Sequence, residues 1–473
     1  MALQICGHKS SVGLLGHDHP ARRINRNSDR RRSPPWRCLP HLVHPPAYRQ
    51  DHPASRRQVT PNPGNISGLQ AINPFERPVY LMCKPASASC NLACSYCYYL
   101  EKSRLYDDSA ELPAAQRRTM SDDMLETYIR RYIESQPGAN VQFTWHGGET
   151  LLRPVEFYER AIALQRRYGA GRNIENCIQT NGTLLNDRWC RFFRDNNWLV
   201  GISIDGPEEF HDEYRRNRGG GPTFRNVMRG IRLLQRHNVE WNAMAVVNDY
   251  NADHPEEFYD FFKNIGCRYL QFTPVVERTT ASSSLAAVDE SGELTPFSVT
   301  PRQWGEFLCR LYDRWVREDV GKIFIQIFDA TLANWAGVAP GVCSLAPTCG
   351  HAAVMEFNGD VYSCDHFVFP AYKLGNLRDT SLIEMMMSDR QRRFGAAKRD
   401  SLPGQCRQCR WLFACNGECP KNRFATDRNG EPGLNYLCEG YSRFFAHVAD
   451  DMSFMRDELA AGRPPANVMQ RHR

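Results

Sequence analysis

Short apolar runs alternate with longer amphipathic stretches from Pro78 onward. The runs are rich in aliphatic and aromatic residues and predict strands, whereas the stretches place apolar residues three or four positions apart and predict helices. Such alternation is typical of an α/β fold with a parallel sheet and helices outside it. Six units are too few for a closed eight-stranded barrel, so we expect an open, partial (β/α)6 barrel. The predicted strands are Val79–Lys84, Val141–Trp145, Ile174–Thr180, Leu199–Ile204, Val239–Val247 and Arg268–Thr273, and the predicted helices are Asp122–Ser135, Val155–Tyr168, Asp187–Asn196, Thr223–His237 and Pro255–Ile265.

Polar and glycine-rich residues directly follow several of the predicted strands. The carboxyl ends of parallel strands meet at one edge of the sheet, and folds of this kind place their chemistry there. We therefore expect these segments to form one site. They are Cys90–Cys97, His146–Glu149, Thr180–Gly182, Ser203–Gly206 and Pro274–Val276.

The first of these segments has the spacing C-x3-C-x2-C, formed by Cys90, Cys94 and Cys97. Three thiolates on one loop can hold three irons of a 4Fe–4S cluster and leave the fourth iron without a protein ligand. That iron can chelate the amino and carboxylate groups of S-adenosylmethionine (SAM), whose one-electron cleavage gives a 5′-deoxyadenosyl radical. Zinc is the competing hypothesis, but a structural zinc site usually has four ligands, and no fourth Cys or His follows at zinc-finger spacing.

A second group of cysteines lies in the last third of the chain. Eight thiolates suffice for two fully ligated 4Fe–4S clusters, and equally for two zinc sites with four thiolates each. Their number alone does not decide between the metals, although the first cysteine loop favours iron–sulfur. The eight are Cys343, Cys349, Cys364, Cys406, Cys409, Cys415, Cys419 and Cys438.

Composition divides the chain into four predicted parts. Residues 1–75 carry one lysine and ten arginines against three aspartates, with many prolines, and are predicted to be a basic, disordered extension. Residues 76–300 are predicted to form the barrel. Residues 301–447 begin with a predicted helix at Pro301–Glu318 and continue into the cysteine-rich segment. Residues 448–473 are predicted to be a polar tail.

The basic extension has two interpretations. Its charge is typical of an arm attracted to nucleic acid or membrane, but its composition fits a dispensable segment equally well, and we favour the latter. We therefore predict neither a nucleic-acid nor a membrane partner. No run approaches eighteen consecutive apolar residues, and the first thirty residues lack the apolar core of a signal peptide. The expected location is cytoplasmic.

Together these motifs resemble the radical SAM superfamily. Its signature is C-x3-C-x-aromatic-C, here with Tyr96 as the aromatic residue. The resemblance implies that Tyr96 contacts the adenine side of SAM and that the backbone of a Gly-Gly-Glu motif meets its amino group. Without the resemblance, Arg215 would be interpreted as an ordinary surface charge. The implied SAM-binding residues are Tyr96, Gly147, Gly148, Glu149, Ser203, Arg215 and Val276.

The second cysteine group resembles a SPASM domain, which carries auxiliary clusters in many peptide-modifying radical SAM enzymes. The resemblance implies two interleaved ligand sets and therefore three 4Fe–4S clusters in all. The first auxiliary set is Cys343, Cys349, Cys364 and Cys419, and the second is Cys406, Cys409, Cys415 and Cys438.

From Pro78 to His447 the chain is similar to anaerobic sulfatase-maturating enzymes, most clearly at Asn358–Val368. The resemblance implies oxidation of a cysteine or serine in a sulfatase to Cα-formylglycine. It implies an unfolded or nascent sulfatase peptide as substrate and a flavodoxin- or ferredoxin-type electron donor. It also implies that Asp365 is the catalytic proton acceptor.

Two departures and two rival functions accompany this resemblance. Thr150 replaces a proline after the Gly-Gly-Glu motif, and Val276 replaces a leucine. Another SPASM enzyme that forms thioether or carbon–carbon crosslinks would use the same cofactors. The hypothesis of a non-catalytic zinc-binding protein leaves unexplained why several residues match SAM contacts of the superfamily.

Overall fold

The computed structural model describes residues 78–106, 118–279 and 292–473. The six predicted strands are present, and each is parallel to its neighbour in the order β1-β2-β3-β4-β5-β6. The predicted partial α/β barrel is therefore confirmed, while the predicted disordered extension lies outside the described residues. The strands are β1 Tyr80–Lys84, β2 Asn140–Trp145, β3 Asn173–Thr180, β4 Leu199–Ser203, β5 Trp241–Val247 and β6 Tyr269–Pro274.

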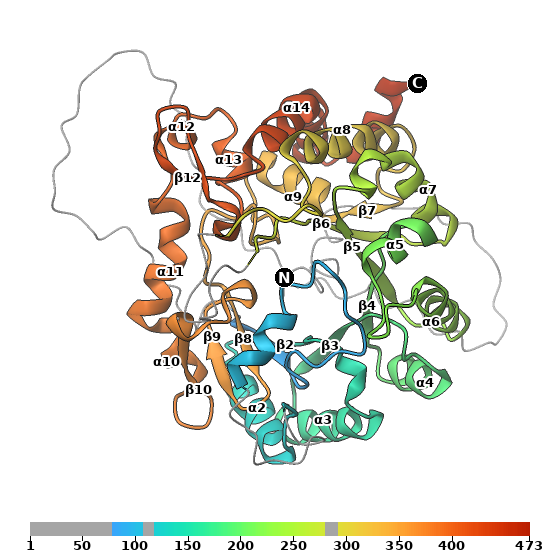
Figure 1. The fold of residues 1–473 in the computed structure, drawn as a ribbon, viewed down its shortest axis with the longest axis vertical. Helices are drawn as coiled ribbons and strands as arrows, with labels where there is room; N and C mark the ends of the chain where they lie inside the picture. The colour runs from blue at the N-terminus through green and yellow to red at the C-terminus, as the bar shows by residue number, and fades with distance from the viewer. Residues whose placement is uncertain (1–77, 107–117, 280–291) are drawn as a thin grey trace.

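Helices cover the outside of this curved sheet (Figure 1). Two of them begin at N-cap residues whose side chains pair with a free backbone N–H of the first turn. Ser121 accepts a hydrogen bond from Met124 N, and Asn186 accepts one from Trp189 N. Among the barrel helices, the pattern did not predict α5, whose seven residues are too few to show a helical period. The helices are α2 Asp122–Glu134, α3 Val155–Tyr168, α4 Asp187–Asp195, α5 Glu208–Tyr214, α6 Phe224–Arg236 and α7 Pro255–Asn264.

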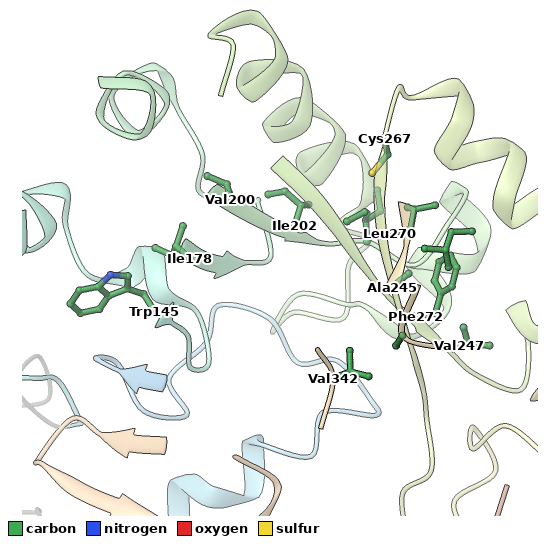
Figure 2. Close-up of a cluster of buried hydrophobic side chains, with 14 of the residues drawn as sticks. Trp145, Ile178, Val200, Ile202, Ala245, Val247, Cys267, Leu270, Phe272 and Val342 are labelled. Atoms are coloured by element: carbon green, nitrogen blue, oxygen red, sulfur yellow. The ribbon is translucent and has the colours of Figure 1, made fainter. Parts of the chain in front are cut away.

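Alternate residues of the strands divide the sheet into two faces. Val200 and Ile202 on β4, and Ala245 and Val247 on β5, are two positions apart and fully buried in the core shown in Figure 2. Trp145 at the end of β2 packs edge-on against Tyr158 of α3, with the rings 5.4 Å apart. Val246, which lies between Ala245 and Val247, lines a cavity inside the barrel, as do Met244 on β5 and Ser203 on β4.

The cysteine-rich part extends the same sheet at both edges. β7 Phe324–Ile325 is parallel to β6, and β8 Ala352–Glu356 is parallel to β1. β9 Asp360–Tyr362 and β10 Lys373–Asn376 follow β8 as antiparallel strands. The sheet therefore continues across the domain boundary predicted near residue 300.

The remaining helices pack beside these strands, and α14 lies along α8 (Figure 1). Gly305 and Gly440 allow this close crossing, because a Cβ on Gly440 would lie 2.3 Å from the carbonyl oxygen of Pro301. The predicted helix at Pro301–Glu318 is α8 and begins at a capping box formed by Thr300 and Gln303. The other elements are α9 Gln326–Trp335, α10 Leu382–Met387, α11 Asp389–Asp400, α12 Gly404–Arg407, α13 Leu412–Cys415, α14 Cys438–Ala460, β11 Ala425–Thr426 and β12 Pro432–Leu434.

The end of the chain differs from the predicted polar tail at 448–473. Helix α14 continues to Ala460, and Val448, Met452 and Met455 on it are buried. These apolar residues recur at helical spacing, but the acidic residues between them hid the period. In the part of the chain that the structure describes, no helix is long and apolar enough to cross a membrane.

Candidate active site

One cavity opens at the carboxyl ends of the barrel strands, where the sequence predicted a single site. Its lining joins the first cysteine loop, the Gly-Gly turn, the end of β4 and the first auxiliary cysteine set. Glu149, Val276 and the second auxiliary set are not part of this lining. The predicted site residues that line it are Cys90, Cys94, Tyr96, Cys97, Gly147, Gly148, Ser203, Arg215, Cys343, Cys349, Cys364, Asp365 and Cys419.

The loop that carries Cys90, Cys94 and Cys97 follows β1 and is fixed by backbone hydrogen bonds. Ala93 N donates to Arg216 O at 2.9 Å, and Ser95 N donates to Tyr214 O at 3.1 Å. Within the loop, Cys97 N donates to Cys94 O at 3.1 Å. The end of α5 and the residues that follow it therefore hold the cysteine loop in place.

Gly148 lies where the loop and the end of β2 approach most closely. Its amide donates to Ser87 O at 2.7 Å, and a Cβ on it would lie only 2.1 Å from Ser89 O. Gly147 beside it has a φ of +135°, which favours glycine. Both glycines are thus required by the local geometry, independently of any cofactor.

We predict that Gly148→Ala displaces the cysteine loop, because backbone atoms of Ser89 cannot move away as a flexible side chain would. Overpacking of this kind typically costs about 1–3 kcal/mol of stability. Thermal unfolding should show a lower midpoint, and equilibrium dialysis should show weaker SAM binding. Gly138→Ala is the matched control, since a Cβ there meets nothing within 4 Å. Equal effects of the two substitutions would contradict the prediction.

The side chain of Glu149 is buried and connects the end of β2 to the end of β3 through hydrogen bonds. Its carboxylate accepts hydrogen bonds from Leu151 N at 2.8 Å, Thr180 Oγ1 at 2.6 Å and Asn181 N at 2.8 Å. Thr150, which replaces the expected proline, donates to Gln179 O at 2.7 Å. That hydrogen bond gives the turn a connection to β3 that a proline could not make.

Arg215 is buried and lines the cavity, so it is not the surface charge that would be expected without the resemblance. Its Nε donates to Asp205 Oδ2 at 2.8 Å, and the Tyr96 hydroxyl donates to the same oxygen. The other oxygen of Asp205 accepts a hydrogen bond from Val246 N at 2.9 Å. The sequence analysis did not single out Asp205, although its place in the polar segment after β4 was a usable signal.

Two other predicted SAM contacts differ in their surroundings. The hydroxyl of Ser203 accepts a hydrogen bond from Gln179 Nε2 at 2.8 Å and lies on the cavity wall. Val276 packs in the core, whereas its neighbour Val275 lines the cavity. The carbonyl oxygen of Val276 accepts a hydrogen bond from Lys421 Nζ at 2.9 Å.

The eight C-terminal cysteines fall into two groups. Burial, followed by the nearby thiols of Cys343 and Cys349, raises the pKa of the Cys364 thiol to about 12. Cys419 likewise has a raised pKa, through burial, Glu418 and then Cys343 and Cys364.

The remaining four thiols influence one another in the same way. Burial, and then Cys406 and Cys409, raise the pKa of Cys438 to about 11. Burial, Glu418 and then Cys438 raise that of Cys415 to about 12. The thiols that influence one another electrostatically fall into the two groupings that the SPASM resemblance implied, and their role as cluster ligands stays a prediction.

These thiols fit iron–sulfur clusters by their chemistry. Among the residues that the structure describes, no three His, Cys, Asp or Glu side chains form a group that could hold a single metal ion. A 4Fe–4S cluster has a different requirement, because each thiolate binds a different iron. Burial and like charges raise the pKa of the bare thiols, and bound cationic iron reverses this effect by stabilising the thiolates.

Asp365 lies on a 3-10 turn directly after Cys364, and its carboxylate is buried. One oxygen makes an ion pair with Lys84, and the other accepts a hydrogen bond from the Tyr98 hydroxyl at 2.5 Å. Burial alone would raise the pKa of Asp365, but the charge of Lys84 holds it well below its usual value. The carboxylate is therefore ionised. Sequence analysis did not identify Lys84 or Tyr98 as part of the site.

Two histidines line the cavity close to Asp365. Within the described residues, His146 Nε2 and His366 Nδ1 are buried and have no hydrogen-bond partner. Burial lowers the pKa of each imidazole to about 3, so both rings are neutral. Neutral rings with a free nitrogen can accept or donate a hydrogen bond to a polar group that enters the cavity.

Comparisons with known proteins agree with this arrangement. A model of the radical SAM superfamily matches residues 85–262, and a model of an iron–sulfur cluster-binding domain matches residues 348–410. The chain is 61% identical over 402 residues to the serine-type anaerobic sulfatase-maturating enzyme of Bacteroides thetaiotaomicron, which covers 84% of this chain and 96% of the relative. The chain belongs to the family of anaerobic sulfatase-maturating enzymes. Its cofactors are accordingly SAM and iron–sulfur clusters.

Two further relatives are less similar to the chain. The cysteine-type anaerobic sulfatase-maturating enzyme of Clostridium novyi is 32% identical over 80% of this chain and 98% of its own length. The solved structure of native anSMEcpe with bound AdoMet, which is SAM, has a TM-score of 0.70 and 30% identity. It covers 80% of this chain and all of that one. Family membership thus rests on similarity across both the barrel and the cysteine-rich part.

Proposed function

We propose that the chain oxidises a serine or cysteine side chain of a sulfatase polypeptide to Cα-formylglycine. One observation carries this proposal: a single cavity is lined by the SAM-type cysteine loop, by Asp365 and by the first auxiliary cysteine set. From serine, the oxidation removes a hydrogen atom, a proton and an electron from one side chain and gives the aldehyde directly. From cysteine, the same three losses give a thioaldehyde, which water hydrolyses to the aldehyde with release of hydrogen sulfide. Three groups would accept them: the SAM-derived radical would take the hydrogen atom, Asp365 the proton, and a cluster held by the first auxiliary cysteine set the electron.

We assign three 4Fe–4S clusters to the chain. Cys90, Cys94 and Cys97 would hold the SAM-binding cluster, and the two auxiliary sets would hold one cluster each. Residues 76–300 would form the SAM-binding part, and residues 301–447 the part that carries the auxiliary clusters. When bound, SAM supplies the radical that removes a hydrogen atom from the Cβ of the target residue. A flavodoxin- or ferredoxin-type protein is the proposed electron donor.

The residues around SAM would orient it rather than react with it. Tyr96, Ser203 and Arg215 offer an aromatic ring, a hydroxyl and a guanidinium on the cavity wall. Gly147 and Gly148 have no side chain, so their backbone could approach SAM closely. Glu149 and Val276 would act indirectly, since Glu149 joins the ends of β2 and β3 and Val276 packs in the core.

Asp365 is the proposed general base. Its carboxylate is ionised and lies in the cavity beside Cys364, which would be a ligand of the first auxiliary cluster. It would take the proton of the substrate hydroxyl or thiol while the electron passes to that cluster. The hydrogen atom, the proton and the electron thereby each have a defined destination.

We further propose serine as the preferred target residue. The chain is 61% identical to a serine-type relative and 32% identical to a cysteine-type relative. The test is to incubate anaerobic enzyme, SAM and reductant with two sulfatase-motif peptides that differ only in serine or cysteine at the target position. A product that reacts with a hydrazide reagent is an aldehyde. Faster aldehyde formation from the serine peptide supports the preference, and faster formation from the cysteine peptide contradicts it. A product that has lost only two hydrogens and does not react is a crosslink and would favour the rival SPASM chemistry.

The proposed ligand sets predict the metal content. Reconstitution with iron and sulfide under anaerobic conditions should give about twelve irons per chain, four for each cluster. Iron and acid-labile sulfide would be measured in parallel with zinc. Stoichiometric zinc with little sulfide would overturn the assignment, whatever the activity of the preparation.

A further inference from the structure

The proposed function leaves unexplained why a lysine is buried beside the site. Lys84 is the last residue of β1, and only 1% of its side chain is exposed. Burial of a lysine is costly unless its charge is paired. Its ammonium makes an ion pair with Asp365 and lies 3.1 Å from the centre of the Tyr99 ring. The charge is thus held between a carboxylate and an aromatic face.

The strands around Lys84 fix its position. Lys84 is paired in register with Glu356, where β1 lies parallel to β8. Glu356 is fully buried and accepts a hydrogen bond from the Tyr99 hydroxyl. The ring that covers the Lys84 ammonium is therefore itself attached to the neighbouring strand, so the lysine has little freedom to move.

The two oxygens of Asp365 have different partners. Lys84 binds Oδ1, and the Tyr98 hydroxyl donates to Oδ2 at 2.5 Å. Two contacts on opposite oxygens fix the rotation of a carboxylate about its last bond, whereas one contact would leave it free to turn. Tyr98 is also packed against His366, with the rings 5.1 Å apart.

We propose that Lys84 is a positioning residue that, together with Tyr98, orients the Asp365 carboxylate toward the target side chain. This inference rests on the proposed function and deepens it. Displacement of a reacting group by about 1 Å can cost about 10²-fold in rate. Without Lys84, hydrogen abstraction still occurs, but the substrate proton lacks a correctly placed acceptor, so SAM cleavage is uncoupled from product formation.

The test measures the amount of formylglycine formed per 5′-deoxyadenosine in the full, reconstituted chain. Lys84→Met removes the charge, and this ratio should fall by about tenfold or more. Lys84→Arg retains the charge and should recover part of the ratio. Lys102→Met is the matched control. Lys102 is also a buried lysine that is paired with a carboxylate, that of Glu101, and lies 3.3 Å from the centre of an aromatic ring, that of Phe369. Unlike Lys84, it lies outside the cavity lining. It should keep the wild-type ratio.

A double variant distinguishes positioning from a general structural role. If Lys84 acts through Asp365, then Lys84→Met should not lower the ratio further in an Asp365→Asn background. The unfolding midpoint gives an independent readout: Lys84→Met alone leaves a buried carboxylate unpaired, so it should unfold at a lower temperature than the double variant.

Either of two results would overturn the inference: a wild-type ratio in Lys84→Met, or an equal further loss in the Asp365→Asn background. If Lys84→Met fails to bind its clusters, the amount of formylglycine per 5′-deoxyadenosine is measured instead in Lys84→Arg and Tyr98→Phe. A wild-type ratio in both of these variants would overturn the inference. Failure of the proposed function is a separate result, because the wild-type enzyme would then form no formylglycine.

Discussion

Replacing Cys90, Cys94 and Cys97 together with alanine should abolish SAM cleavage. The three thiols lie on one loop that is fastened to Tyr214 and Arg216, so no other cysteine can take their place without displacing that loop. The variant should keep about eight irons, because the two auxiliary sets are intact. Chromatography of 5′-deoxyadenosine measures the first outcome, and iron analysis measures the second.

The matched control is a second triple variant in which Cys190, Cys267 and Cys309 are replaced by alanine. These cysteines are free and buried, as small apolar residues often are, and none lines the cavity. This control should retain SAM cleavage and about twelve irons. SAM cleavage at the wild-type rate by the first variant would refute the ligand assignment.

Much of the barrel could be predicted because its signals are local. Each strand is a short apolar run, and each helix shows its own period. The polar segments that follow the strands converge because parallel strands share one carboxyl edge, which is a property of the topology rather than of any single residue. The cysteine loop could be recognised for the same reason, since all three proposed ligands lie within eight consecutive positions.

What could not be predicted depends on contacts between distant parts of the chain. β8 is short, and its partner β1 lies near the start of the described residues, so no local pattern shows the pairing of Lys84 with Glu356. The ion pair of Lys84 and Asp365 is equally hidden, because a lysine at the end of a strand is usually exposed. The C-terminal half of helix α14 was not predicted, because acidic residues stand between the buried apolar residues that recur along one face of the helix.

Asp365→Asn should reduce formylglycine formation from a serine peptide by about 10²–10⁴-fold, the usual contribution of a general base. Asparagine is nearly isosteric and can still accept the hydrogen bond from Tyr98, so cluster content and SAM binding should be retained. Hydrogen abstraction does not require the base, and some 5′-deoxyadenosine should therefore still form. Both products would be measured in the same reactions.

The effect should be smaller for the matching cysteine peptide. A thiol has a pKa of about 8.5, and a serine hydroxyl is much less acidic, so the serine substrate depends more strongly on a base. Asp319→Asn is the matched control, since Asp319 is a buried aspartate that also binds a tyrosine and a lysine, at 2.9 Å and 2.7 Å, but lies outside the cavity lining. Unchanged formylglycine formation in Asp365→Asn would refute the proposed base. The proton acceptor would then have to be another group on the cavity wall, with His366 the nearest candidate in the sequence.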